Sequence, residues 1–595
     1  MRTTAVFFAA LAALLFLFAA MIACDDDDDN DNDASGVDDD QSTGDDDSAA
    51  DDDDDNDDDD SADDDNDDDT VHPSLIPGPD DPGYDEDLEA AAEQRERQFH
   101  VFNAYGMDIS ADVSVSLDEP ANRALIEDFI LNSDSWDFAA VTGLDPFDVV
   151  TEWQFTAGLY SGVGIAADAY RYGVLRDEGY PQADIDRARD FLQKAIEALK
   201  VAYLITGTPG VIARGYVRTD IPGPGPGIET TPLFDEEGNP LPAEKNNGTN
   251  RADNSVGGLY PNYVWVDSCS RDQYIGWAAA FAAVWEVIRD DPSFDDDLKA
   301  DLQDYARELA LALSVVRESG FDLEIPDADG RTTYHGYLNE NNYDRIYIPW
   351  LPIKNGMYSL MAIGILGALA YVAEDEEVDA YLYDTLIDQR QLDLIARQNQ
   401  IGVDLWVISN YSSVNMAFQG AWLAHRYLDR PRSRNLVKLT LAERLYDKPM
   451  WHQRQAKEIK QSLFDFVYAA SLADASVYTT MSAEPDAEAM AHGLETLADF
   501  PVAPFWEYGV VNCDEDEIAA GHCLCVDGET ELDLMPILGR GDKVVSVQPV
   551  PIKVRPTSNY YWRSNPYEVN GGSDGTRLLP AVDFLYAYWL GRWTR

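Results

Sequence analysis

The chain of 595 residues carries 42 Lys and Arg against 112 Asp and Glu, a formal net charge of −70 at pH 7. So acidic a protein is unsuited to binding nucleic acid, whose phosphates it would repel. The sequence contains no Walker loop, dinucleotide-binding fingerprint, zinc-protease motif or Gly-x-Ser-x-Gly elbow, which sets those enzyme classes aside, and we expect neither a cofactor nor a metal site.

The first 23 residues have the layout of a signal peptide. Arg2 is the only early positive charge, and the run from Ala5 to Ala23 has no polar side chain. The run is also close to the ~20 residues that span a bilayer, so an uncleaved membrane anchor is the alternative. Residues 21–24, Met-Ile-Ala-Cys, resemble the lipobox of bacterial lipoproteins, with Met where Leu is usual. The resemblance implies a lipidated Cys24 and an extracytoplasmic protein, held by its lipid alone on the outer membrane or cell surface rather than on the inner membrane.

Residues 25–70 form an acidic linker. Of these 46 residues, 28 are Asp and none is Lys, Arg or aromatic. Such a segment cannot bury enough apolar surface to fold and it repels itself, so we predict a disordered tether with a reach of at most about 160 Å. Calcium binding is the alternative, but the spacing of an EF-hand loop is missing. Without these 28 Asp the rest of the chain still carries a formal charge of −42.

Beyond residue 150, two kinds of helix alternate. Residues 152–172 are apolar, aromatic or small on nearly every side, which indicates burial all round, whereas residues 184–205 have one apolar and one charged face. The same couplet recurs at 271–288 with 295–317, at 355–372 with 378–397, at 410–428 with 435–446 and, less regularly, at 453–473 with 485–497. We therefore predict an all-α fold, an α/α toroid of about six hairpins in which each buried helix lies inside and its charged partner outside.

The loops distinguish a toroid from a plain stack of helical repeats, which would give a similar pattern. Stacks have similar repeats and short loops, but here the loops 207–270 and 321–354 are long and rich in Gly, Pro, Asn and aromatic residues. Long ordered loops usually carry function. We divide the chain into a signal peptide (1–23), the lipidated cysteine and linker (24–70), a helical lead-in (71–150) and the toroid (151–595).

Four cysteines follow Cys24 in a compartment where disulfides persist. They are Cys269, Cys513, Cys523 and Cys525. Three pairings are possible, and Cys513 could bridge either Cys523 or Cys525 around a short loop. A metal site built from this group and His522 is the alternative. The surrounding insert, near 512–551, is expected to be a small loop or strand-forming feature of the surface.

In a toroid every buried helix begins at the same rim, so polar residues at these starts and in the loops before them are expected to share one cleft. Aromatic rings mixed with amide, carboxylate and guanidinium groups suit sugars, whose C–H faces stack on rings and whose hydroxyl groups need polar partners. The predicted substrate-binding residues are Arg214, Tyr263, Trp265, Arg271, Gln273, Tyr334, His335, Asn341, Asn342, Asn355, Asn410, Trp562 and Arg563. For the last two, which lie in an aromatic cluster near the C-terminus, a structural role is the alternative.

The stretch Ser270–Tyr274 is the most distinctive single element, because it places polar residues in the first turn of a buried helix. Helix capping is its plain explanation. A guanidinium at Arg271 would, however, keep the neighbouring Asp272 ionised, as a nucleophile or base requires. A glycoside hydrolase also needs an acid, for which Glu340 and Asp267 are the candidates.

A polysaccharide lyase is the alternative reaction. Tyr334 or His335 would remove the proton beside a uronate carboxylate, while Asn341 or Arg271 stabilised the charge that forms. A histidine beside aromatic residues is, however, more often structural.

The helical couplets, the Ser270–Tyr274 start and the aromatic run Tyr586–Arg592 resemble the broad class of bacterial α/α-toroid proteins that contains glycoside hydrolases and polysaccharide lyases. The resemblance covers residues 152–592 and lies in the architecture, since no diagnostic catalytic motif of one family is matched. It implies a membrane-anchored, extracytoplasmic protein that acts on a polysaccharide or glycan. Glycoside hydrolysis is the first expectation, with elimination or non-catalytic binding of a glycan or protein as alternatives.

Overall fold

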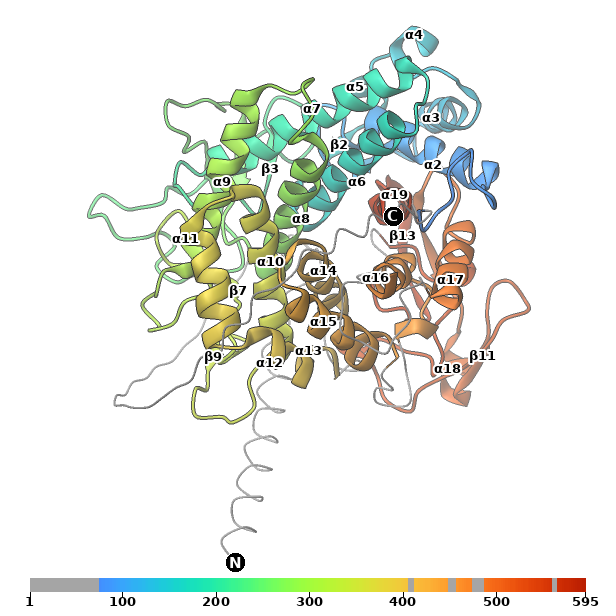
Figure 1. The fold of residues 1–595 in the computed structure, drawn as a ribbon. Coiled ribbons are helices and arrows are strands. Elements are labelled where there is room, and N and C mark those ends of the chain that lie inside the picture. Colours follow the sequence, from blue (N-terminus) through green and yellow to red (C-terminus); the bar gives the residue numbers. More distant parts are fainter. Residues whose placement is uncertain (1–73, 405–410, 448–455, 474–485, 559–563, 595) are drawn as a thin grey trace, which may run out of the picture. The chain divides into compact units, whose positions relative to one another are not determined.

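The computed structural model describes residues 74–404, 411–447, 456–473, 486–558 and 564–594 (Figure 1). Helices make up about half of the chain, and the strands of the described residues are few and short, so the predicted dominance of helix is confirmed. The predicted signal peptide, Cys24, the acidic linker, Asn410, Trp562 and Arg563 lie outside the described residues.

Six helices of the described chain, which we call the central helices, are buried on nearly all sides. They are α6 (Gly158–Asp177), α8 (Arg271–Ile288), α10 (Gly356–Ala373), α14 (Ser412–Tyr427), α16 (Ser462–Ala473) and α19 (Val582–Trp593). Each contacts the next in this order and α19 packs against α6, so the contacts make a closed circuit. Between α6 and α8 the backbones touch, because a Cβ atom on Gly162 would lie 2.1 Å from the carbonyl oxygen of Gly276. Only glycine fits there.

A second set of helices covers the central ones. Helix α7 (Gln182–Leu204) packs on α6, α9 (Asp296–Ser314) on α8 and α10, α12 (Leu392–Gln398) on α10, α15 (Pro431–Thr440) on α14, α17 (Ala487–Ala498) on α16, and α2 (Glu86–Gln98) on α19. These helices are amphipathic: in α7, Leu192, Ile196 and Leu199 are buried, whereas the charged residues lie on the other face. Buried and amphipathic helices therefore alternate along the chain, as the sequence predicts.

Two predicted helices have different bounds. Helix α6 begins at Gly158 rather than at residue 152, because Glu152–Trp153 pairs as strand β2 and the Trp153 amide donates to Pro222 O. The stretch 378–397 is interrupted: Gln391 has a φ of 55°, a left-handed conformation in which a helix cannot continue. The pieces on its N-terminal side are α11 (Glu376–Asp379) and the π-helix η2 (Ala380–Gln389).

One antiparallel sheet joins the two ends of the described chain. It consists of β1 (Val113–Ser114), β2 (Glu152–Trp153), β10 (Trp506–Val511) and β13 (Asn570–Leu578), in the order β10-β13-β1-β2. Val113 lies opposite both Leu578 and Trp153. The lead-in therefore belongs with the rest of the helices in one unit, Pro73–Arg595. Its other elements are the π-helix η1 (Phe99–Asn103), α3 (Pro120–Asn132), α4 (Phe138–Thr142) and α5 (Pro146–Val149).

Short strands in the loops before α8 and α10 were not predicted. Strands β3 (Gly215–Arg218), β5 (Tyr263–Val266) and β4 (Asn250–Ala252) form a sheet in that order, β6 (Glu324–Pro326) pairs with β7 (Thr332–Tyr337), and β8 (Asn342–Tyr343) pairs with β9 (Ile346–Tyr347). Strands this short do not extend over enough residues to reveal an alternation of polar and apolar side chains. The remaining helices are α13 (Ile401–Asp404), η3 (Leu441–Tyr446), η5 (Ala456–Glu458), η6 (Arg540–Asp542) and η7 (Ile552–Val554).

Helix α10 is the one described helix that is long and apolar enough to cross a membrane, with a mean hydropathy of 1.7. Yet 94 % of this stretch is buried inside the protein. Burial of this degree is the behaviour of a core helix.

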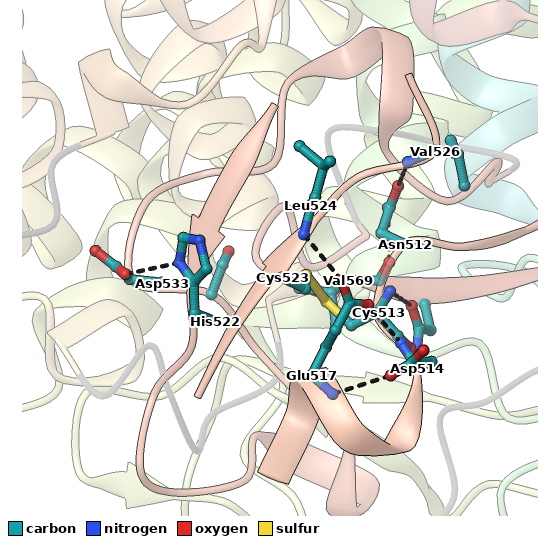
Figure 2. The surroundings of a disulfide bond; sticks show 12 residues. Asn512, Cys513, Asp514, Glu517, His522, Cys523, Leu524, Val526, Asp533 and Val569 are labelled. Carbon is teal, nitrogen blue, oxygen red and sulfur yellow. Dashed lines mark hydrogen bonds and ion pairs between the residues drawn. A yellow bond between two sulfur atoms is a disulfide. The ribbon is translucent and has the colours of Figure 1, made fainter. Parts of the chain in front are cut away.

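The insert carries one disulfide, between Cys513 and Cys523 (Figure 2). It contains α18 (Glu515–Ala520), β11 (His522–Leu524) and β12 (Glu531–Asp533), packed around an apolar cluster separate from the main core. Cys269 and Cys525 are free and buried. As disulfide candidates these two were wrong: the thiol of Cys269 lies in the main core just before α8, and that of Cys525 in the small cluster. The alternative metal site with His522 is wrong too, because two of its sulfur atoms are bonded to each other.

We expect the two free thiols to be unreactive in the folded protein. Burial raises the pKa of Cys525 to about 11 and that of Cys269 well above its usual range, because a buried thiolate loses its hydration. Titration of a Cys24→Ser variant with a thiol reagent should find no thiol under native conditions and two after unfolding without reductant. Four thiols after unfolding, or rapid reaction of the folded protein, would contradict this assignment.

Candidate functional site

Neighbouring central helices of the described chain begin beside one another. The Leu159 amide in the first turn of α6 donates to Gln273 Oε1 in the first turn of α8 (2.8 Å). The Arg271 guanidinium at the start of α8 lies 5.0 Å from the ring centre of Tyr358 in the first turn of α10. The starts of α16 and α19 line one small pocket. The starts of α6 and α8 and those of α8 and α10 therefore lie side by side.

The densest polar and aromatic group lies where α8 and α10 begin, and we call it the α8–α10 cluster. Its members are Arg271, Tyr334, His335, Asp344, Arg345 and Tyr358. Besides facing Tyr358, Arg271 donates from Nη1 to the carbonyl oxygen of His335 (3.3 Å). The rings of Tyr334 and His335 meet edge to face, with centres 4.7 Å apart. Helix α8, helix α10 and strand β7 thus each contribute a side chain to one cluster.

A tight turn between β8 and β9 supplies the two remaining members. Asp344 and Arg345 have φ values of 45° and 66°, a turn geometry that favours Asn or Gly and is strained for larger side chains. The turn holds the Arg345 guanidinium 3.9 Å from the ring centre of Tyr334 and Asp344 Oδ1 3.8 Å from His335 Nδ1. Backbone strain that positions charged side chains in this way is a feature of functional sites.

Asp344 lies beside His335 but makes no hydrogen bond to it, since Oδ1 and Nδ1 are 3.8 Å apart. Burial alone would raise the pKa of Asp344, but the nearby His335 imidazole and the charge of Arg271 hold it below its usual range. Asp344 is therefore ionised, and its charge lies close to the imidazole. Nδ1 is buried, which leaves Nε2 as the atom through which His335 can exchange a proton with a ligand.

Asp272 lies next to this cluster in the first turn of α8. It accepts hydrogen bonds from Ser270 Oγ and from Gln273 Nε2 (3.1 Å), and Arg214 Nη1 donates to Ser270 Oγ (2.8 Å). Ser270 occupies the N-cap position, but its side chain makes no capping hydrogen bond to the helix backbone. The capping explanation for this serine is therefore wrong: it links Arg214 to the carboxylate.

The two candidate acids are both engaged with cations. Glu340 receives hydrogen bonds from Arg390, whose Nη1 also binds Asp322 (2.6 Å). Asp267 is buried and accepts from Arg251 Nε (2.8 Å). Burial and the neighbouring Asp327 raise the pKa of Asp267 to about 6, which suits an acid, but its oxygens are already occupied by the Arg251 guanidinium and a backbone amide.

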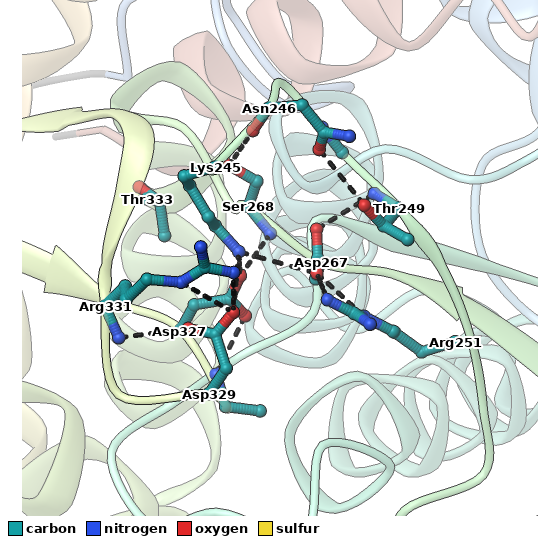
Figure 3. A network of polar contacts seen from close by, with 12 residues as sticks. Lys245, Asn246, Thr249, Arg251, Asp267, Ser268, Asp327, Asp329, Arg331 and Thr333 are labelled. Carbon is teal, nitrogen blue, oxygen red and sulfur yellow. Dashed lines mark hydrogen bonds and ion pairs between the residues drawn. The ribbon is translucent and has the colours of Figure 1, made fainter. Parts of the chain in front are cut away.

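Asp267 belongs to a buried ionic network, the Lys245 cluster, shown in Figure 3. It comprises Lys245, Arg251, Asp267, Asp327, Asp329 and Arg331, so three carboxylates face three cations. The carboxylate oxygens lie within 4.8 Å of one another, the spacing of a metal site. Lys245 Nζ lies 3.4 Å from Asp267 and 3.5 Å from Asp329 and contacts Asp327 directly. The ammonium group thus takes the place that a metal ion would need.

The Lys245 cluster supports the backbone beneath the α8–α10 cluster. Asp327 Oδ2 accepts from the amide of Ser268 (3.1 Å), a residue held at a φ of 62°. Ser268 Oγ in turn accepts from the amide of Tyr334 (2.9 Å). The ionic network therefore fixes the loop before α8 relative to the strand that carries His335.

Several predicted binding residues have structural partners. Trp265 is fully buried with Nε1 bonded to Ala252 O, and Tyr263 packs edge to face on Tyr216. Asn355 caps α10 by accepting from the Tyr358 amide. The amide side chains of Asn341 and Asn342 are bonded within their own loop, to Asn339 and to the Arg345 backbone. Of the predicted set, Arg271, Tyr334 and His335 come together, whereas Asp344 and Arg345 were missed.

Comparisons with known proteins found no relative of this chain. No family model matches it, and neither a curated protein nor a solved structure gives a match.

Proposed function

We propose that the chain is a carbohydrate-active protein held outside the cytoplasm by a lipid on Cys24, and that its helices form an α/α toroid of six hairpins. The closed circuit of contacts from α6 through α19 and back supports the toroid. The signal-like N-terminus and the lipobox-like residues 21–24 support the anchor. The substrate site is the α8–α10 cluster at the starts of the central helices.

The reaction that this cluster suits best is β-elimination on a polysaccharide that contains uronate residues. The observation that carries this proposal is the arrangement of Arg271, His335 and Asp344: the Arg271 guanidinium donates to the backbone of His335, whose imidazole lies 3.8 Å from the Asp344 carboxylate. Arg271 would pair with the uronate carboxylate, which makes the neighbouring C–H group more acidic. Arg345 adds a second positive charge beside Tyr334.

The steps follow from the positions of these groups. His335 Nε2 takes the proton from the carbon beside the carboxylate, and the electron pair of that C–H bond forms a double bond to the next carbon as its glycosidic C–O bond breaks. The departing oxygen receives a proton from the hydroxyl group of Tyr334, the neighbour of His335. The products are an unsaturated sugar and a new chain end.

Hydrolysis is the second candidate reaction. The position of the Asp272 carboxylate favours it. Its carboxylate lies at the start of α8, held by Ser270 and Gln273. A hydrolase needs a second, protonated carboxyl group, and both candidates for that role, Glu340 and Asp267, are bound to arginine. Elimination needs no such partner.

A panel of uronate-containing and neutral polysaccharides separates the two reactions. We expect ultraviolet absorbance from an unsaturated product with the uronate polymers, and loss of that product in His335→Gln but not in Asp272→Asn. Reducing ends without ultraviolet absorbance, lost in Asp272→Asn, would establish hydrolysis instead. Binding without turnover would leave a non-catalytic glycan receptor, and neither binding nor turnover on any polymer would overturn the proposal.

A further inference from the structure

A second group of ionisable side chains lies away from the α8–α10 cluster, between the lead-in and the central helices. Glu96 at the end of α2, His100 in the π-helix η1 and Asp168 in the middle of α6 are brought together there. His100 Nε2 lies 3.1 Å from Glu96 Oε2 and 3.1 Å from Asp168 Oδ1. All three side chains are at most 6 % exposed.

The donor atoms have the identity and spacing of a metal site. One imidazole nitrogen and two carboxylate oxygens lie within 4.8 Å of one another, and ligands that bind one small cation at about 2.0–2.1 Å approach each other to roughly this range. Glu96 and His100 are four residues apart on consecutive helical turns, so their side chains share a face. In the Lys245 cluster an ammonium group lies between the carboxylates; here the atom between them is an imidazole nitrogen, which can itself coordinate a metal.

The surroundings hold these three groups in place. Trp589 Nε1 in α19 donates to Glu96 Oε1 (2.6 Å), which leaves Oε2 directed to the site. The His100 ring stacks on Phe191 with centres 3.8 Å apart. Such partners of the ligands are usual around bound metals, because they fix ligand orientation. A π-helical turn like η1 is likewise frequent at functional sites.

Arg171 supplies an observation that points to a further ligand atom. Its side chain is 5 % exposed, and Nη1, 3.7 Å from Glu96 Oε2, makes no hydrogen bond within the described residues. A buried guanidinium N–H without an acceptor is costly. Water or hydroxide on a metal at this site would provide that acceptor.

We propose that Glu96 Oε2, His100 Nε2 and Asp168 Oδ1 bind a divalent transition metal, Zn²⁺ or an ion of similar size and ligand preference. One nitrogen and two oxygen ligands match this class better than Ca²⁺, which takes six to eight oxygens. Because the site is buried, the role of the ion is structural. The ion joins the lead-in (α2 and η1) to α6, and the hydrogen bond from Trp589 to Glu96 extends this link to α19. The site is independent of the proposed carbohydrate reaction.

The full chain, stripped of metal by a chelator, allows a direct test with Co²⁺ as a visible probe. An excess of Ca²⁺ is kept in the buffer to occupy the carboxylates of the acidic linker, which would otherwise bind cations loosely. We expect one Co²⁺ per chain, a visible absorption band from a site with a nitrogen ligand, and loss of the band on addition of Zn²⁺. Zn²⁺ at a hundredfold excess over its Kd should raise the melting temperature by on the order of 2 °C.

Three variants locate the ion. Asp168→Asn should abolish the band, and Trp589→Phe, which keeps all three ligands and removes only the N–H donor to Glu96, should weaken binding about tenfold. His522→Gln is the matched control, because His522 also lies near two carboxylates, Asp533 and Glu531, but on the surface. It should leave Co²⁺ binding unchanged.

Two results would overturn the proposal. One is a wild-type protein with neither a visible band nor a shift in melting temperature, which would mean that Glu96, His100 and Asp168 form ion pairs only. The other is a band that persists in Asp168→Asn or disappears in His522→Gln. If Asp168→Asn fails to fold, as judged by circular dichroism, the affinity of Trp589→Phe decides, and an unchanged affinity counts against the site.

Discussion

Replacing Arg271 with alanine is expected to lower kcat/KM on a uronate polysaccharide by about 100- to 1000-fold, the usual effect of removing one charged donor from a reacting centre. The guanidinium lies over Tyr358 and donates to the backbone of His335, so it is placed to pair with the substrate carboxylate next to the proposed base. Arg271→Lys should recover only part of the activity, because an ammonium group keeps the charge but not the forked pair of donors.

Initial rates from the ultraviolet absorbance of the unsaturated product measure this effect, with kcat and KM determined separately. Arg289→Ala is the matched control: this arginine terminates the same helix at its opposite end, and its side chain is 45 % exposed. Its kcat/KM should stay within a factor of two of wild type. Equal activity of wild type and Arg271→Ala would remove Arg271 from the reaction.

Replacing Lys245 with methionine is expected to cost about 3–5 kcal/mol of unfolding free energy, as when one partner of a buried ion pair is removed. Lys245 is the cation that lies among Asp267, Asp327 and Asp329, and its loss leaves three carboxylates facing the charges of two arginines. Because the same network fixes the loop before α8 through Ser268, activity should fall together with stability.

Denaturant unfolding followed by circular dichroism checks this prediction. Lys543→Met, at an exposed lysine of the insert, should change the unfolding free energy by less than about 0.5 kcal/mol. The double variant Lys245→Met with Asp327→Asn restores the charge balance and should recover part of the loss. A single Lys245→Met variant as stable as wild type would show that the network contributes nothing to the fold.

The sequence was sufficient for most of the helices. The predicted helix 271–288 has the same bounds as α8, and 355–372 differs from α10 by one residue at each end, because runs of apolar and small residues between polar loops are read directly from the chain. The start of α6 was missed because the two residues predicted to begin the helix, Glu152 and Trp153, form a strand instead. This strand pairs with β1, which lies more than thirty residues earlier in the chain. Such pairing leaves no local signal.

The candidate site was only partly predictable. Arg271, Tyr334 and His335 stood out because charged and aromatic residues are unusual at the starts of buried helices and in long loops. Asp344 and Arg345 were missed because a turn with two residues at positive φ is usually recognised in a sequence by Asn or Gly, and the pair Asp-Arg lacks both. The engagement of Asp267 by Lys245 was equally hidden: the two residues are 22 positions apart, and only the folded chain brings them together.

The negative charge of the chain beyond the linker opposes the binding of an acidic glycan. Two arginines of the α8–α10 cluster, Arg271 and Arg345, must attract a carboxylate against a formal charge of −43 on the chain beyond the linker. Only short-range contact can achieve this, since charges more than about 8 Å apart are screened at physiological salt. The preference for a uronate must therefore depend on these two side chains.

Calorimetric titration of one uronate oligosaccharide and of its carboxyl-reduced, neutral counterpart tests this claim most directly. We expect the uronate to bind the wild-type protein at least about tenfold more tightly, as a charge-assisted hydrogen bond allows, and the preference to vanish in the double variant Arg271→Ala with Arg345→Ala. Equal affinity of the wild-type protein for the two sugars, or a preference that survives the double variant, would contradict the account.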